Sequence, residues 1–148
     1  MGILEAVLVG LLAGFIGTIV MTVSETVEMR LTGRPPSTVP GQVGAKTLGR
    51  DPNRVAHLER LSTGVHWLHG TSMGAVRGLL ALTGLGAVAA TVVHYALVWG
   101  GDAATYRALG IAPAPWRWGA GELVTDLFHK GIYAVATGVA FVLLAELI

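Results

Sequence analysis

Histidine and acidic residues recur toward one end of four apolar segments of this chain. Imidazole and carboxylate groups bind iron, manganese and zinc, and they also transfer protons. Asp126 and His129 are three residues apart, a spacing that places both side chains on one face of a helix. Bundles that hold two metal ions use a related Glu-x-x-His pair with further glutamates from neighbouring helices. The predicted metal ligands and their neighbours are Glu25, Glu28, His66, His69, His94, Glu122, Asp126 and His129.

The match to a di-metal bundle is partial. Only one acid-x-x-His pair occurs, and it has aspartate in place of glutamate. His66 and His69 lie on the same segment, whereas His94 is alone on the next one. Two interpretations of the layer therefore stay open: a bound metal ion, or a structural or proton-conducting network of ionisable groups.

The charged residues nearby have simpler expected roles. Lys130 follows Asp126 by four residues, so the two are expected to pair on one helix face. Arg77 lies near the opposite end of its segment, where pairing with Glu5 or Glu146, or extension to the membrane surface, is expected. These assignments need no bound ligand.

The composition is that of a membrane protein. Of 148 residues, 53% are hydrophobic and 13% charged, whereas soluble domains carry about 25% charged residues. The 21 glycines suit closely packed membrane helices. The absence of cysteine excludes disulfides, thiolate nucleophiles, iron–sulfur clusters and c-type haem, so a metal must bind imidazole and carboxylate. A net charge of +1 gives no indication of a nucleic-acid partner.

The apolar segments predict an all-α fold, a four-transmembrane-helix antiparallel bundle in one domain covering residues 1–148. A membrane helix needs roughly 20 apolar residues. Thr83 to Gly86 should form a tight turn between the second and third spans. Asp102 is expected to cap the third. The predicted spans are 3–29, 61–82, 86–100 and 119–147.

Basic residues predict the orientation. They concentrate in the loops 30–60 and 101–118, while the opposite side has Arg77 alone. The positive-inside rule then places both loops in the cytoplasm and both termini outside, in a multi-pass protein of the bacterial inner membrane. The N-terminus lacks the basic region of a cleaved signal peptide, so the first span should remain as an anchor. The tryptophans near the cytoplasmic side predict an interfacial belt: Trp67, Trp99, Trp116 and Trp118.

The 30–60 loop is long for a compact bundle. A short helix is predicted over 42–48, and Asp51-Pro52-Asn53 resembles a helix start, so the second long helix should begin near Asn53. The loop is either a lid above the polar layer or a surface connection.

Several short stretches resemble a group of small bacterial membrane proteins with no assigned function. The resemblance implies a four-helix membrane protein, and it implies no chemistry and no functional residue. The stretches are Met21-Thr22-Val23-Ser24-Glu25, Arg30-Leu31-Thr32-Gly33-Arg34-Pro35-Pro36-Ser37, His66-Trp67-Leu68-His69-Gly70, Ala114-Pro115-Trp116-Arg117-Trp118 and Asp126-Leu127-Phe128-His129-Lys130 with Tyr133.

Three functions are compatible with these patterns. The first is a metal-binding membrane protein that uses iron, manganese or zinc for redox chemistry or metal handling. The second is a non-catalytic accessory or assembly subunit, in a homodimer or a larger membrane complex. The third is b-type haem held by two histidines, such as His69 with His94 or His129. A secondary transporter fits less well because no inverted repeat is evident. In each case the lipid bilayer is the surrounding partner.

Overall fold

The computed structural model describes residues 1–147, and its regular structure is helical throughout. No strand occurs within that range. Short 3-10 turns at Pro52–Arg54 and Pro115–Arg117 lie in the connections. The predicted all-α class is confirmed. The α-helices are α1 (Ile3–Thr32), α2 (Val39–Thr47), α3 (Leu58–Ala81), α4 (Ala87–Ala108) and α5 (Ala120–Ala145).

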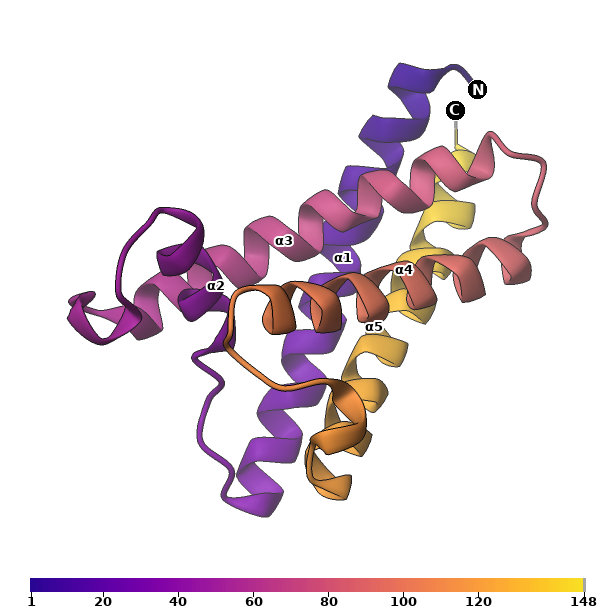
Figure 1. Ribbon diagram of the computed structural model, residues 1–148. Coiled ribbons are helices and arrows are strands. Elements are labelled where there is room, and N and C mark those ends of the chain that lie inside the picture. The colour runs from indigo at the N-terminus through magenta and orange to yellow at the C-terminus, as the bar shows by residue number, and fades with distance from the viewer. Residues whose placement is uncertain (148) are drawn as a thin grey trace.

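The four long helices alternate in direction along the chain (Figure 1). The N-terminus, the α3–α4 turn and the end of α5 lie at one end of the molecule, as Figure 1 shows. Helix α1 packs against α3 and α5, and α4 packs against α5. The α3–α4 pair crosses the α1–α5 pair obliquely, so the four helices diverge away from the end that holds the termini.

Two helices, α1 and α5, are long and apolar enough to cross a membrane, judged by length and composition alone. The other two long helices within residues 1–147 do not reach the same combination of length and hydropathy. The structure therefore gives weak support to membrane association.

Glycines let α1 approach its neighbours closely. Gly14 of α1 faces Gly74 of α3 so closely that a Cβ added to Gly14 would lie 2.7 Å from the Gly74 Cα atom. Thr18 packs over Gly70, and Gly17 packs against Thr137 of α5. The small-residue face of α1 is thus an internal helix–helix contact, as expected for glycines of closely packed membrane helices.

The molecule carries small and polar side chains inside and large apolar ones outside. The largest fully buried side chains include Arg77, Tyr133 and His94, whereas apolar side chains cover the outer faces of α1 and α5. A soluble protein of this size seldom exposes so much apolar surface. Exposed examples are Leu4, Leu8, Leu12, Val23, Val135, Val139 and Leu143.

Two predicted helix boundaries are wrong. Helix α4 continues to Ala108 rather than ending at Gly100, so Asp102 lies buried inside it instead of capping it, and the predicted loop 101–118 is shorter. Helix α3 begins at Leu58 rather than near Asn53, because His57 adopts a left-handed backbone conformation with φ 59°.

The short helix and the tight turn were predicted correctly. Helix α2 covers the segment 42–48 except for its last residue and packs on the first turns of α3, where Ser62 Oγ donates to the Ser37 carbonyl at 2.9 Å. Gly84, with φ +82°, lies in the turn between α3 and α4. Helix α2 is thus fixed to the body of the protein.

Arg77 does not have the predicted acidic partners. Its guanidinium lies 4.6 Å from the centre of the Phe141 ring and forms no salt bridge within residues 1–147. The Glu5 carboxylate instead accepts a 2.7 Å hydrogen bond from the Gly2 amide. A cation over an aromatic face gains about 0.5–2 kcal/mol, depending on desolvation.

Candidate functional site

The predicted polar layer divides into two clusters. The first, here called the α4-side cluster, consists of His69, Asp102, Asp126 and Lys130. The Lys130 ammonium lies 3.0 Å from a carboxylate oxygen of Asp102 and 3.0 Å from one of Asp126. His69 Nε2 lies 2.9 Å from the other oxygen of Asp102. The cluster joins α3, α4 and α5 at the cytoplasm-proximal end proposed from the sequence.

Lys130 holds the position between two carboxylates that a metal ion would need. Its Nζ atom is also 5.1 Å from the centre of the Tyr106 ring, and 12% of its side chain is exposed. A buried ion pair is favourable only when its members stay together, because each charge alone pays a large desolvation penalty. The α4-side cluster is therefore a network in which both aspartates already contact a cation of the same chain, and the predicted pair between Asp126 and Lys130 is confirmed.

The second cluster, here called the α1-side cluster, consists of Glu25, Glu28, His66 and His129. Glu28 Oε2 is 3.7 Å from His129 Nε2, and Glu25 Oε2 is 4.0 Å from His66 Nε2. Neither pair makes a direct hydrogen bond at these distances. Because Glu25 and Glu28 are one turn apart on α1, the two acid–imidazole pairs adjoin.

His129 is the most deeply placed member of the α1-side cluster, with 4% of its side chain exposed. Its Nδ1 atom hydrogen-bonds Ser24 Oγ at 3.0 Å, and its buried Nε2 has no hydrogen-bond partner within residues 1–147. In the tautomer that donates from Nδ1 to Ser24, Nε2 presents a lone pair toward the Glu28 carboxylate. In that tautomer, the lone pair and the carboxylate can together bind a cation.

His66 is held by a different contact. Thr22 donates its hydroxyl proton to the Thr18 carbonyl at 2.7 Å, so its oxygen is left to accept from His66 Nε2 at 3.0 Å. This fixes the proton of His66 on Nε2, the nitrogen nearest Glu25. His66 therefore has a donor, not a lone pair, on the side of its ring that is nearest Glu25.

Glu28 also contacts a cation from the loop. Arg34 donates to Glu28 Oε2 from Nη2 at 2.6 Å and from Nε at 2.9 Å. The other oxygen of Glu28 accepts from Thr32 Oγ1 at 2.9 Å. Among residues 1–147, no arginine or lysine forms a salt bridge with Glu25.

Two predicted ligands lie outside both clusters. His94 Nε2 donates to the Met73 carbonyl at 2.9 Å, and its ring packs 5.6 Å from that of Tyr133. Glu122 forms no side-chain hydrogen bond or salt bridge with any residue in 1–147. Over that same part of the chain, no three histidine or acidic side chains are arranged to hold a metal ion.

Sequence reasoning placed Asp102 as a helix cap, and it did not predict the contacts that Tyr106, Ser24 and Arg34 make with the clusters. Asp102 and Tyr106 follow His94 and Val98 at steps of four residues, a spacing that marks one face of a continued helix. The signal was therefore present, but the pair Gly100-Gly101 favoured a helix end. No sequence pattern indicates the contacts of Ser24 and Arg34, because they depend on how α1 meets α5 and the following loop.

The comparisons with known proteins assign no relative to this chain. No protein-family model matches it, and neither curated proteins nor solved structures give a match. The resemblance to small bacterial membrane proteins stays a prediction, and the function has to be argued from the residues themselves.

Proposed function

We propose that this protein is a four-span membrane protein that binds a metal ion in the α1-side cluster. It would lie in the bacterial inner membrane with both termini outside and the clusters toward the cytoplasm. The ion would be iron, manganese or zinc, the metals suited to mixed imidazole and carboxylate ligands. The role would be redox chemistry or metal handling.

The apolar exterior supports the membrane placement. Helices α1 and α5 present exposed leucine and valine side chains over their length, and each is long enough to cross the hydrocarbon core. Their buried faces carry glycine, alanine and threonine, as expected where helices pack without a hydrophobic driving force between them.

Helices α3 and α4 complete the proposed four spans. Residues 61–76 and 87–101 contain no Asp, Glu, Lys or Arg. Among the ionisable groups in or beside these stretches, His94 and Arg77 are buried and His66 is half-buried, whereas His69 is exposed and contacts Asp102. Polar side chains that face the interior of a bundle and not its lipid side are the usual pattern in membrane proteins.

One observation carries the metal proposal: the buried Nε2 of His129 faces the Glu28 carboxylate without a hydrogen-bond partner. Metal-binding histidines commonly use the other ring nitrogen to hydrogen-bond a neighbouring group, which fixes the ring and its tautomer. Ser24 makes that contact here. Glu25, one turn away on α1, adds a second carboxylate beside the pair.

The α4-side cluster is not part of this proposal. The carboxylates of Asp102 and Asp126 already contact Lys130, and His69 already contacts Asp102. A metal ion would have to displace an ammonium group from between two carboxylates. We therefore assign Glu28 and His129 as ligands, with Glu25 and His66 as neighbours.

The test is elemental analysis and an absorption spectrum on the same detergent-purified sample. Stoichiometric metal is expected in the wild type and in the control His57→Ala, because His57 lies exposed in the loop before α3. His129→Ala should lose the metal while keeping its helical circular dichroism and its elution volume. A haem spectrum would instead support the b-type haem alternative. Metal-free, folded wild type would contradict the proposal and favour an accessory subunit.

A further inference from the structure

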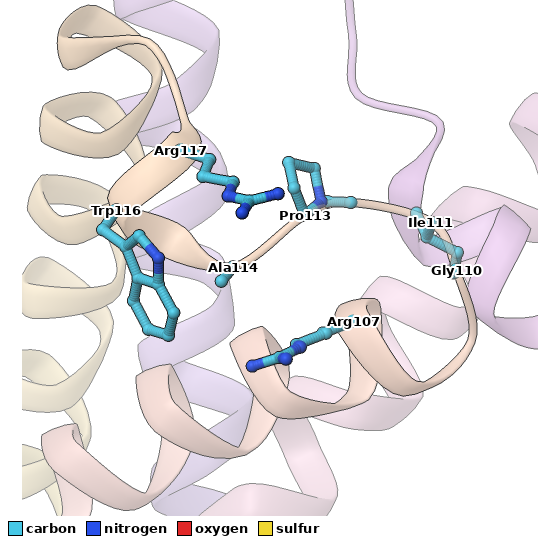
Figure 2. Close-up of a pocket in the computed structure, with 8 residues that line it drawn as sticks. Arg107, Gly110, Ile111, Pro113, Ala114, Trp116 and Arg117 are labelled. Atoms are coloured by element: carbon cyan, nitrogen blue, oxygen red, sulfur yellow. The ribbon is translucent and has the colours of Figure 1, made fainter.

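The segment between α4 and α5 forms an open pocket of about 440 Å³ that belongs to neither cluster. Arg107, from the end of α4, lines it together with Trp116, Arg117 and residues 110–114. Figure 2 shows the two guanidinium groups on either side of the Pro113–Ala114 stretch, with the Trp116 ring on the Arg107 side. No acidic side chain lines the pocket, and neither arginine forms a salt bridge within residues 1–147.

Hydrogen bonds hold the backbone of this pocket in place. Trp118 Nε1 donates to the Pro113 carbonyl at 2.8 Å, and the Ile111 amide donates to the Tyr106 carbonyl at 2.8 Å. Lys46 of α2 donates to the Leu109 carbonyl at 2.6 Å and brings a third cation to the same region. The pocket is thus formed before any ligand binds, which lowers the entropic cost of binding.

The lining residues suit a ligand that has an anionic group next to an apolar part. Guanidinium groups bind phosphate through paired N–H donors, and arginine is the preferred residue for that contact. Ile111, Pro113 and Ala114 provide apolar walls beside the two charges. Trp116 is 76% exposed, and the Arg107 guanidinium lies 6.0 Å from the centre of its ring. Exposed tryptophan is enriched at the depth of lipid headgroups.

We propose that this pocket binds the phosphate group of an anionic phospholipid in the cytoplasmic leaflet. The inference rests on the membrane placement under the proposed function, but not on the metal site. Basic pockets on the cytoplasmic side of membrane helices bind such headgroups, and each arginine near the surface adds to the attraction. A soluble phosphate ester carries the same chemistry, so the test separates the two sources.

The experiment measures lipid binding to the detergent-purified full chain by native mass spectrometry. The probes are phosphatidylglycerol and phosphatidylcholine of the same acyl chains. We expect at least about tenfold tighter binding of phosphatidylglycerol, since each charged hydrogen bond contributes about a factor of ten. The double variant Arg107→Gln/Arg117→Gln should lose this preference, whereas Arg50→Gln, an exposed arginine away from the pocket, should keep it.

A parallel titration uses glycerol 3-phosphate. Weak or absent binding of this ester, with arginine-dependent binding of phosphatidylglycerol, supports the lipid. Equal, arginine-dependent binding of both would assign the pocket to a soluble ester and overturn the lipid source. If the double variant keeps its preference for phosphatidylglycerol, this pocket is not the binding site and the proposal is wrong. Both arginines are exposed, so the variant should fold, and Arg107→Lys/Arg117→Lys retains the charge as a check. Metal content, measured on the same samples, should not change.

Discussion

The two clusters contain similar side chains, but their carboxylates are paired with cations to different degrees. In the α4-side cluster, Lys130 contacts both aspartates directly, and the histidine contacts one of them. In the α1-side cluster, two glutamates face two histidines at 3.7 and 4.0 Å, and the cation that reaches Glu28 comes from the loop after α1. Both carboxylates of the first cluster contact Lys130. Within residues 1–147, the second cluster has one glutamate with no arginine or lysine partner, and the buried Nε2 of His129 has no hydrogen-bond partner.

The α4-side cluster is therefore expected to contribute mainly to stability, and the α1-side cluster mainly to ligand binding. Groups that satisfy one another stabilise the fold and have little capacity for a ligand. Groups held apart by their helices cost stability and retain that capacity. We expect substitutions in the α4-side cluster to change unfolding, and those in the α1-side cluster to change metal content.

The largest effect, a loss of free energy of unfolding, is expected from Lys130→Met. It leaves Asp102 and Asp126 facing each other without a cation, and removing one partner of a buried ion pair costs about 3–5 kcal/mol. The free energy of unfolding in mixed detergent and dodecyl sulfate micelles measures the loss. The double variant Lys130→Met/Asp126→Asn should recover part of it. A Lys130→Met protein as stable as the wild type would remove the distinction between the clusters.

The next effect is expected from Gly74→Ala, which widens the contact between α1 and α3. An added Cβ would lie 2.6 Å from the Gly14 Cα atom, and overpacking of this kind costs about 1–3 kcal/mol. Since only the α1-side cluster includes α1, metal content should fall with stability. Gly64→Ala is the matched control, because nothing lies within 4 Å of its added Cβ. Loss of metal in both variants would argue against the role of the α1–α3 contact.

A smaller effect is expected from Ser24→Ala. It removes the hydrogen bond that orients His129, and loss of such a supporting contact weakens metal binding by roughly 10–100-fold. Competition with a metal indicator measures the affinity. Ser72→Ala, at an exposed position of α3, should leave it unchanged. An unchanged affinity in Ser24→Ala would mean that the His129 ring is fixed by other contacts.

The smallest effect is expected from Arg34→Gln, and its direction is opposite. Arg34 competes with an added cation for Glu28 Oε2, so its removal should tighten metal binding, by about two- to fivefold given the modest strength of ion pairs near a protein surface. The control is Arg30→Gln, which removes an exposed charge from the last turn of α1. Weaker binding in Arg34→Gln would show that the arginine holds Glu28 in its ligand position.

The sequence predicted the helices better than the contacts that side chains make between helices. Apolar length and glycine spacing identified four long helices, the small-residue face of α1 and the short helix between α1 and α3, because these features are local. The predicted end of α4 was wrong. Gly100 and Gly101 usually weaken a helix, but here they lie inside one and face open space. The helix continues because Asp102 and Ala103 are buried on its other side.

The division of the polar layer was beyond sequence reasoning. Spacing along each segment predicted a single polar layer, but the length of each helix and the rotation about its axis decide which neighbours a side chain meets, and His94 lies in the half of α4 away from Asp102. His129 turns toward α1 and Asp126 toward Lys130, although they are three residues apart. His94 turns to the Met73 carbonyl. Spacing gives the face of a single helix, and the packing of four helices selects the partners.

Arg77 has a consequence for how the protein is made. In the proposed topology, its guanidinium enters the bilayer with α3, about one turn from the helix end. The Phe141 ring that covers it belongs to α5, which leaves the ribosome later. Until then a guanidinium that faces lipid costs up to about 2.5–3.5 kcal/mol. A chain truncated before α5 should therefore insert α3 less efficiently than the full chain, and Arg77→Leu should remove that difference in a membrane-insertion assay.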